Sequence, residues 1–220
     1  MTEVKAADVI AVVDACRCFE WAPYPGGWRG EVEAALIDAV LSIQARYGRP
    51  DNGVRGALAR YRRHEDRQRL DDLTRLAAWS AKDLQDVLEI AQRTAGVSKA
   101  AAIVEAATEL VTVGVRHADQ VEPDDDVCRA DQRRAYTSVR GLGEVTWEYL
   151  GMSLGIPGVK ADTWIIRFAS NAIGRHVSRD EARALVIAAA AEFGVDPIRL
   201  DYAIWRHMSS TTARRRRRPR

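Results

Sequence analysis

Residues 139–167 read VRGLGEVTWEYLGMSLGIPGVKADTWIIR and contain two glycine-rich turns, each followed by a helical pattern. Gly141 and Gly143 predict a tight turn whose backbone bends freely and can approach a ligand closely. Helical periodicity follows, so backbone N–H groups should face outward at a helix N-terminus, which binds anions such as phosphate. A second turn at 155–158 precedes Asp162, which opens another helix. We therefore expect a carboxylate beside a phosphate-binding turn.

The patterns GLGEVT at 141–146 and GIPGVKADTWIIR at 155–167 resemble a known motif. It is the helix-hairpin-helix and Gly/Pro-Asp motif (HhH-GPD) of base-excision DNA glycosylases similar to endonuclease III. In that family, main-chain amides of the hairpin bind the DNA backbone, often with a monovalent cation. The Asp after the Gly/Pro loop is catalytic, and Asp162 corresponds to it by its position before Thr163. The resemblance spans about residues 31–208.

Two positions depart from the family pattern. Bifunctional members carry a Schiff-base lysine two residues after the second hairpin glycine, where this chain has Val145. A proline commonly precedes the first hairpin glycine, where this chain has Arg140. The resemblance therefore implies a monofunctional hydrolase without lyase activity. Lys160, two residues before Asp162, is an alternative amine, and we favour a phosphate contact or solvent exposure for it.

The resemblance implies cleavage of the N-glycosidic bond of a nucleotide flipped out of duplex DNA. Departure of the base leaves oxocarbenium character on the sugar, which Asp162 would stabilise while it positions or deprotonates the attacking water. An Asp before a helical run is also a preferred N-cap, and the two roles are compatible. The alternative is a non-catalytic helix-hairpin-helix DNA-binding protein in which Asp162 only caps the helix.

The resemblance also implies DNA contacts at and around the hairpin. The hairpin candidates are Arg140, Gly141, Leu142, Gly143, Val145 and Thr146. A Na⁺ or K⁺ ion is implied at the hairpin carbonyls near Gly141 and Gly143. The sequence LSIQ at 41–44 resembles a family element whose glutamine, here Gln44, lies on the DNA side; ordinary solvation is the alternative. Lys160 is a further candidate contact, and Lys99-Ala100 matches a pair that the family often has.

Three aromatic residues are candidates for the pocket that receives the base. Trp28 and Tyr24 lie in a loop rich in aromatic residues and glycine, and Trp147 follows the hairpin. Aromatic faces stack on bases. Packing in the core is the alternative for each of them, since bulky aromatic residues in helices are usually buried.

The charge distribution predicts a basic tail rather than a uniformly basic surface. Residues 213–220 contain six arginines, and removing them from the formal net charge of +2 leaves about −4 for the rest. We expect this tail to be disordered and to bind phosphates without sequence preference. The six arginines between 55 and 69 occur together with the acids Glu65, Asp66, Asp71 and Asp72, which favours a solvated, ion-paired helix over a phosphate-binding face. Double-stranded DNA is the expected partner, and we expect a monomer.

Cysteine and histidine usage argues against a metal enzyme. The three cysteines, Cys16, Cys18 and Cys128, cannot all be paired in disulfides. No cysteine follows Cys128, so the iron–sulfur cluster of some family members is not expected. The four histidines show no metal-binding spacing. No apolar run approaches the roughly 20 residues that cross a bilayer, and no secretory signal is apparent. We expect a cytoplasmic, nucleoid-associated protein without cofactors.

Every element that the sequence allows us to place is helical, so we predict an all-α fold. N-cap signals stand at Ser80, Ser98, Ser178 and Asp196, and Glu181 suggests a capping box with Ser178. The resemblance implies a two-lobed fold with a DNA-binding cleft between the lobes. We expect one domain at 1–212, with one lobe from about 1–31 and 155–212 and the other from about 32–154.

Overall fold

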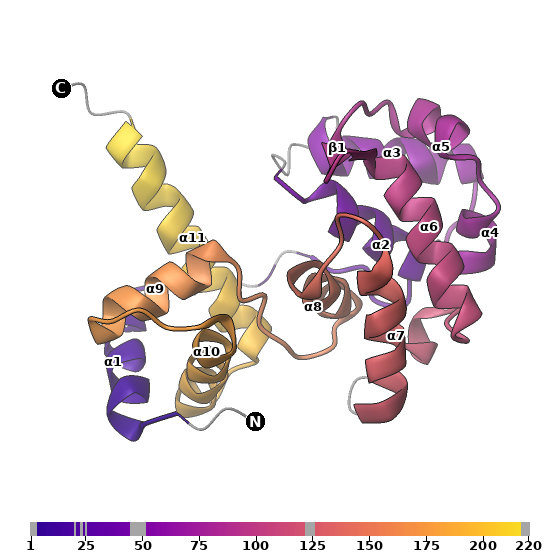
Figure 1. Cartoon of the computed structure of the whole chain (residues 1–220). Helices are drawn as coiled ribbons and strands as arrows, with labels where there is room; N and C mark the ends of the chain where they lie inside the picture. Colours follow the sequence, from indigo (N-terminus) through magenta and orange to yellow (C-terminus); the bar gives the residue numbers. More distant parts are fainter. Residues whose placement is uncertain are drawn as a thin grey trace. The chain divides into compact units, whose positions relative to one another are not determined.

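The computed structural model describes residues 4–19, 21–22, 24, 26–44, 52–121 and 126–216, without the side chains of 126–127 and 210–216. These residues form eleven α-helices, a short 3-10 helix and one β-hairpin with two residues in each strand (Figure 1). The predicted all-α class is confirmed. No described helix is both long and apolar enough to span a membrane.

The chain divides into two compact units. The terminal unit comprises Met1–Pro25 and Pro157–Arg220, and the central unit comprises Gly26–Ile156. The helices of the terminal unit are α1 (Ala6–Cys16), α9 (Thr163–Ile173), α10 (Arg179–Phe193) and α11 (Pro197–Arg216). The elements of the central unit are α2 (Val32–Leu41), α3 (Gly53–Glu65), α4 (Leu73–Ala77), α5 (Ala81–Leu88), β1 (Arg93–Thr94), β2 (Val97–Ser98), α6 (Lys99–Thr112), the 3-10 helix Ala118–Gln120, α7 (Asp126–Ser138) and α8 (Glu144–Leu154).

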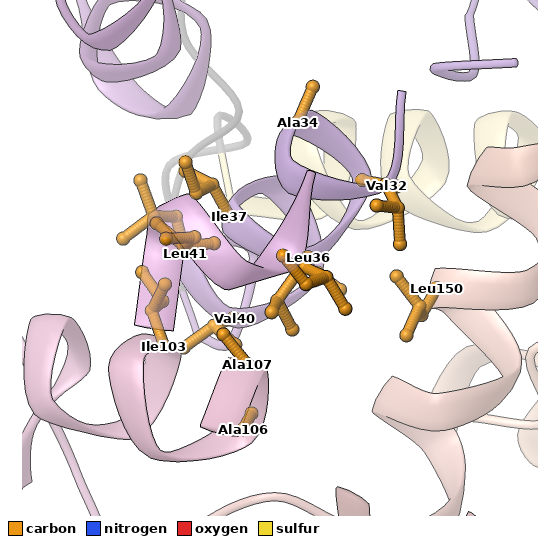
Figure 2. Close-up of a cluster of buried hydrophobic side chains, with 14 of the residues drawn as sticks. Val32, Ala34, Leu36, Ile37, Val40, Leu41, Ile103, Ala106, Ala107 and Leu150 are labelled. Atoms are coloured by element: carbon orange, nitrogen blue, oxygen red, sulfur yellow. The ribbon is translucent and has the colours of Figure 1, made fainter. Parts of the chain in front are cut away.

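Helix α2 is the core of the central unit and is buried on every side. It packs against α3, α4, α6 and α8. Figure 2 shows its apolar side chains, among them Leu36 and Val40, beside Ile103 of α6 and Leu150 of α8. All ten of its residues are buried. Its two acids, Glu33 and Asp38, are accommodated because they have polar partners inside the unit.

Glu33 is fully buried and accepts hydrogen bonds from three different segments. Its carboxylate oxygens lie 2.7 Å from the Tyr61 hydroxyl and 2.8 and 3.0 Å from Nη2 of Arg67, and the backbone N–H of Asp72 donates at 2.8 Å. Burial, together with the charge of Glu33, raises the pKa of Tyr61 above its ordinary value, so the hydroxyl stays a donor. This carboxylate ties α2 to α3 and to the segment before α4.

Asp38 connects α2 to the segment before it and to α8. Its carboxylate accepts from the Trp28 indole N–H at 2.7 Å, from the Ser42 hydroxyl at 2.8 Å and from the Tyr149 hydroxyl at 3.3 Å. It is 1% exposed, so a missing partner would leave a charge poorly solvated. Three arginines of α3 and the loop after it pair with acids from other segments, which supports a structural role for them: Arg60 with Glu89, Arg62 with Glu31 and Arg67 with Glu33.

The terminal unit packs α1 and α11 against α9 and α10 around its own apolar core. The predicted N-caps Ser178 and Asp196 accept from backbone N–H groups at 3.2 and 2.8 Å. The predicted capping box was wrong, because the Glu181 carboxylate lies 2.6 Å from Arg175 instead. Helix α11 ends at Arg216, and residues 217–220, the rest of the tail predicted to be disordered, lie outside the described residues.

The buried Glu33 carboxylate should dominate the stability of the central unit. We expect Glu33→Ala to lower the free energy of unfolding by about 3–5 kcal/mol, because Arg67 and Tyr61 lose their buried partner. The matched change Glu89→Ala removes a carboxylate that is 69% exposed and paired with Arg60, and should cost less than about 1 kcal/mol. Urea unfolding followed by circular dichroism measures both. Equal losses would contradict this ranking.

Candidate functional site

The turn at 139–143 joins α7 to α8, and Gly141 is required there by the fold. Its φ is +90°, in the left-handed region that favours glycine. A Cβ at this position would lie 2.7 Å from the Thr94 side chain, whose hydroxyl donates to the Gly141 carbonyl at 3.0 Å. The small β-hairpin therefore packs directly against the turn. No sequence pattern pointed to Thr94 as its partner.

Gly143 differs from Gly141, because its backbone is extended and the space around it is open. Its N–H, predicted to face a ligand, donates instead to the Thr146 hydroxyl at 3.0 Å. The next two backbone N–H groups, of Glu144 and Val145, have no hydrogen-bond acceptor among the described residues. The N–H groups without an acceptor therefore lie in the first turn of α8 and not at Gly143, and anion binding there stays a prediction.

Two hairpin residues that were predicted to contact DNA have side chains that pack or form hydrogen bonds within the central unit. Leu142 is 8% exposed and belongs to the hydrophobic core. The Thr146 hydroxyl both accepts from the Gly143 N–H and donates to the Gly143 carbonyl, at 2.7 Å. These side chains hold the turn in shape, and the DNA contacts predicted for both residues stay predictions. Arg140 is exposed, and its guanidinium lies above Gly96 in the β-hairpin turn.

The carbonyls predicted to bind Na⁺ or K⁺ already accept hydrogen bonds, and the ion there stays a prediction. The Gly143 carbonyl already accepts from the backbone N–H groups of Thr146 and Trp147, both at 3.0 Å, and from the Thr146 hydroxyl. The Gly141 carbonyl accepts from Thr94. Among the described residues there is also no cluster of three or more His, Cys, Asp or Glu side chains suited to a metal.

Lys99 supports the end of α2 where Gln44 lies. Its ammonium is buried and donates to the carbonyls of Leu41 and Ile43 at 2.8 and 2.6 Å. Burial lowers the pKa of Lys99. Gln44 itself is exposed with φ +49°, just beyond the carbonyls that Lys99 holds. The structure thus gives Lys99 a local role that its sequence position alone did not reveal: it satisfies helix-end carbonyls and fixes the backbone before Gln44.

The three aromatic pocket candidates have different surroundings. Trp147 is 1% exposed and packs on Tyr136 with ring centroids 5.5 Å apart, so it is a core residue and the pocket prediction is corrected. Trp28 is half-buried, bonded to Asp38 and covered by Arg62 at 5.9 Å. Tyr24 belongs to the terminal unit, where its ring meets Tyr202 edge-on at 5.5 Å.

An open cavity of about 810 Å³ lies elsewhere in the central unit. Residues of α6, α7 and the 3-10 helix line it, including Glu109, Gln120, Cys128 and Arg134. None of its lining residues is one of the predicted site residues. We therefore do not place the candidate catalytic site in this cavity.

Asp162 is the N-cap of α9, as predicted, and only one of its carboxylate oxygens accepts hydrogen bonds from the described residues. Oδ1 accepts from the backbone N–H groups of Trp164 at 2.7 Å and Ile165 at 3.3 Å. Oδ2 accepts no hydrogen bond from the described residues. The side chain is half-buried. Asp162 is thus a rigidly held carboxylate with one oxygen available to a ligand, beside the dipole of a helix N-terminus.

Asp201 of α11 contacts the segment that leads to Asp162, at a position that no sequence motif indicated. Its Oδ2 accepts from the Lys160 backbone N–H at 2.6 Å, and it is 7% exposed. Burial, aided by the negative charge of Asp162, raises the pKa of Asp201 to about 8. A signal in the sequence was that Asp201 lies between Leu200 and Ala203, two apolar residues that are buried in the core. The Lys160 side chain is half-buried, and its predicted DNA contact stays a prediction, as does that of Val145.

The buried carboxyl of Asp201 should make stability depend on pH. Its pKa is higher in the folded chain, about 8, than the ordinary 3.8, so the folded state binds the proton more tightly. The free energy of unfolding of the wild type should then fall as pH rises from about 4 to about 8. Asp201→Asn cannot lose a proton and should be more stable than the wild type at pH 8 while matching it near pH 4. Urea unfolding across this range measures the difference.

Asp180→Asn is the matched control, because Asp180 is exposed in the same unit. It should leave the pH dependence of unfolding unchanged. Parallel curves for the wild type and Asp201→Asn between pH 4 and 8 would contradict a protonated buried carboxyl.

Comparison with known proteins gives a family but no function. Residues 10–209 match the family model described as Domain of unknown function (DUF8548). No curated protein and no solved structure matches the chain. The family match covers nearly the whole length, including the hairpin, Asp162 and Asp201. The chain therefore belongs to the DUF8548 family.

Proposed function

We propose that this protein is a monofunctional DNA glycosylase of base-excision repair. It would hydrolyse the N-glycosidic bond of a damaged or modified base flipped from duplex DNA. The observation that carries the proposal is the state of Asp162, whose carboxylate is held by two backbone N–H groups through one oxygen and keeps the other oxygen available. The resemblance of 141–167 to the helix-hairpin-helix glycosylases supplies the reaction class.

Cleavage of the N-glycosidic bond needs a carboxylate whose position is fixed before the reaction. When the base departs, positive charge develops on the sugar, and a carboxylate already oriented by its surroundings stabilises it without reorganisation. The open Oδ2 of Asp162 would face the sugar or the attacking water. Flipping the base costs a few kcal/mol of unstacking, least for damaged or mispaired bases, and this favours them as substrates.

A lyase step is not part of the proposal. Schiff-base chemistry needs an amine at the hairpin, and the position that would supply it holds the apolar Val145. Lys160 is the nearest lysine in sequence to Asp162, and its backbone is fixed by Asp201. Hydrolysis by water, with an abasic site as the product, is the reaction that these residues support.

DNA binding would begin at the hairpin of the central unit. A Cβ at Gly143 would meet open space, the N–H groups of Glu144 and Val145 are available, and Arg140 is exposed. Backbone amides at a helix N-terminus suit a phosphate. In this proposal the fold is the two-lobed HhH-GPD fold with DNA in the cleft between its lobes, acting as a monomer on double-stranded DNA in the cytoplasm. Gln44 and the arginines after residue 213 would add contacts.

A second candidate function is a non-catalytic helix-hairpin-helix DNA-binding protein. The observation that favours it is that Asp162 is a complete helix cap, which is reason enough for an Asp at this position. Both candidates predict DNA binding through the hairpin. Only the glycosylase predicts a product.

Asp162→Asn separates the two candidates. Asparagine caps helices about as well as aspartate, so the fold should persist while the charge is lost. We expect abasic product to fall by about 100-fold or more. The assay incubates the protein with a panel of duplexes, each with one modified or mispaired base, and scores strand breaks before and after alkali. The matched control is Asp196→Asn, the same change at the N-cap of α11.

The wild type and the control should give breaks only after alkali. Full activity of Asp162→Asn on a duplex that the wild type cleaves would remove Asp162 from the mechanism. Breaks without alkali would show a lyase step. Tight binding with no product from any duplex would leave the DNA-binding protein as the function.

Gly143→Ala tests the hairpin as the DNA contact. The extended backbone and the open space allow a methyl group, so the protein should stay folded while the methyl obstructs a phosphate. We expect about tenfold weaker binding to duplex DNA, or about 1.4 kcal/mol. Thr108→Ala is the control, because Thr108 is exposed on α6 and is not among the predicted DNA contacts. Fluorescence anisotropy at two salt concentrations measures both; equal affinities would place the contact elsewhere.

A further inference from the structure

We propose that Asp201 is a positioning residue for Asp162: its carboxyl group holds the main chain of Lys160 and thereby fixes the segment that delivers Asp162 to the start of α9. The inference rests on the proposed function, since it concerns how the proposed catalytic carboxylate is oriented. All the residues involved lie in the terminal unit.

A continuous path of hydrogen bonds connects the two acids. Asp201 Oδ2 accepts from the Lys160 N–H at 2.6 Å. The Lys160 carbonyl accepts from the Asp162 N–H at 2.6 Å. Oδ1 of Asp162 then accepts from the first turn of α9. A change in the position of the Lys160 peptide is therefore transmitted directly to the Asp162 backbone.

The segment before Asp162 has little regular structure of its own. Ala161 N–H donates to the Val159 carbonyl at 3.0 Å, and the bond from Asp162 to Lys160 has the same two-residue spacing, so two narrow turns follow each other. Val159 and Ala161 are buried, which places the Lys160 peptide between two core residues. A backbone N–H in such surroundings needs an acceptor. Asp201 is that acceptor.

The charge of Asp201 fits a supporting role better than a reacting one. The charged groups that act on it are Lys160 and Asp162. Because burial raises the pKa of Asp201 to about 8, its carboxyl is protonated at neutral pH and places no second negative charge beside Asp162. Asparagine would reproduce this state, with an acceptor oxygen and no charge.

Two pairs of variants test the inference in the full-length protein. Asp201→Ala and Asp201→Leu both remove the acceptor, and leucine keeps the branched shape of the buried side chain in case the alanine variant does not fold. Asp201→Asn keeps the acceptor. Asp196→Ala is the control, because it removes the cap of the same helix without touching the Lys160 segment.

The first measurement is amide hydrogen exchange, which does not depend on activity. In Asp201→Leu the amides of Lys160 and Asp162 should exchange at least tenfold faster than in the wild type, whereas Asp201→Asn and Asp196→Ala should leave them unchanged. Unchanged exchange in Asp201→Leu would overturn the inference, even if the protein proves to be a glycosylase.

The second measurement is steady-state kinetics on whichever duplex the wild type cleaves. A misplaced carboxylate should lower kcat of Asp201→Leu by about tenfold to 100-fold with KM within about twofold, and Asp201→Asn should restore kcat. A merely structural role would instead lower the active fraction of Asp201→Leu and Asp196→Ala alike. Unchanged kcat in Asp201→Leu would overturn the inference. No cleavage by the wild type would overturn the proposed function, and the exchange result would then decide whether Asp201 orders this segment.

Discussion

The central unit depends on two carboxylates buried in α2. Glu33 binds α3 and the segment before α4 to this helix, and Asp38 binds Trp28, Ser42 and α8 to it. Each is stable inside the core only because several donors converge on it, and each therefore specifies how the surrounding segments meet. The hairpin at 139–143 is held indirectly by this arrangement, since it precedes α8.

The same physical device recurs at the candidate site. A backbone group that helices or strands cannot satisfy is satisfied by one side chain from a distant segment: Thr94 for the Gly141 carbonyl, Lys99 for the end of α2, Asp201 for the Lys160 N–H. Each of these side chains fixes an irregular segment next to a predicted functional residue. Such rigidity is what a preorganised carboxylate and a phosphate-binding turn require.

Local signals predicted much of this structure. The helical periodicities predicted the all-α class, and short-range capping chemistry predicted the N-caps at Ser80, Ser98, Ser178 and Asp196. Asp162 as the cap of α9 was predicted in the same way. These features involve residues within about four positions of one another, so the sequence contains all the partners. The glycosylase function came from a resemblance of residue patterns and stays a proposal.

The tertiary structure decided which side chains bind segments that are distant from them in sequence. The sequence by itself determined the helices, their caps and the two glycine turns, because these follow from backbone geometry and local hydrogen bonds. It did not reveal that Trp147 and Leu142 lie in the core, that Thr146 binds the Gly143 N–H in place of a ligand, or that Asp201 holds Lys160. Burial and long-range pairing depend on where other helices pack, and no local pattern records that packing.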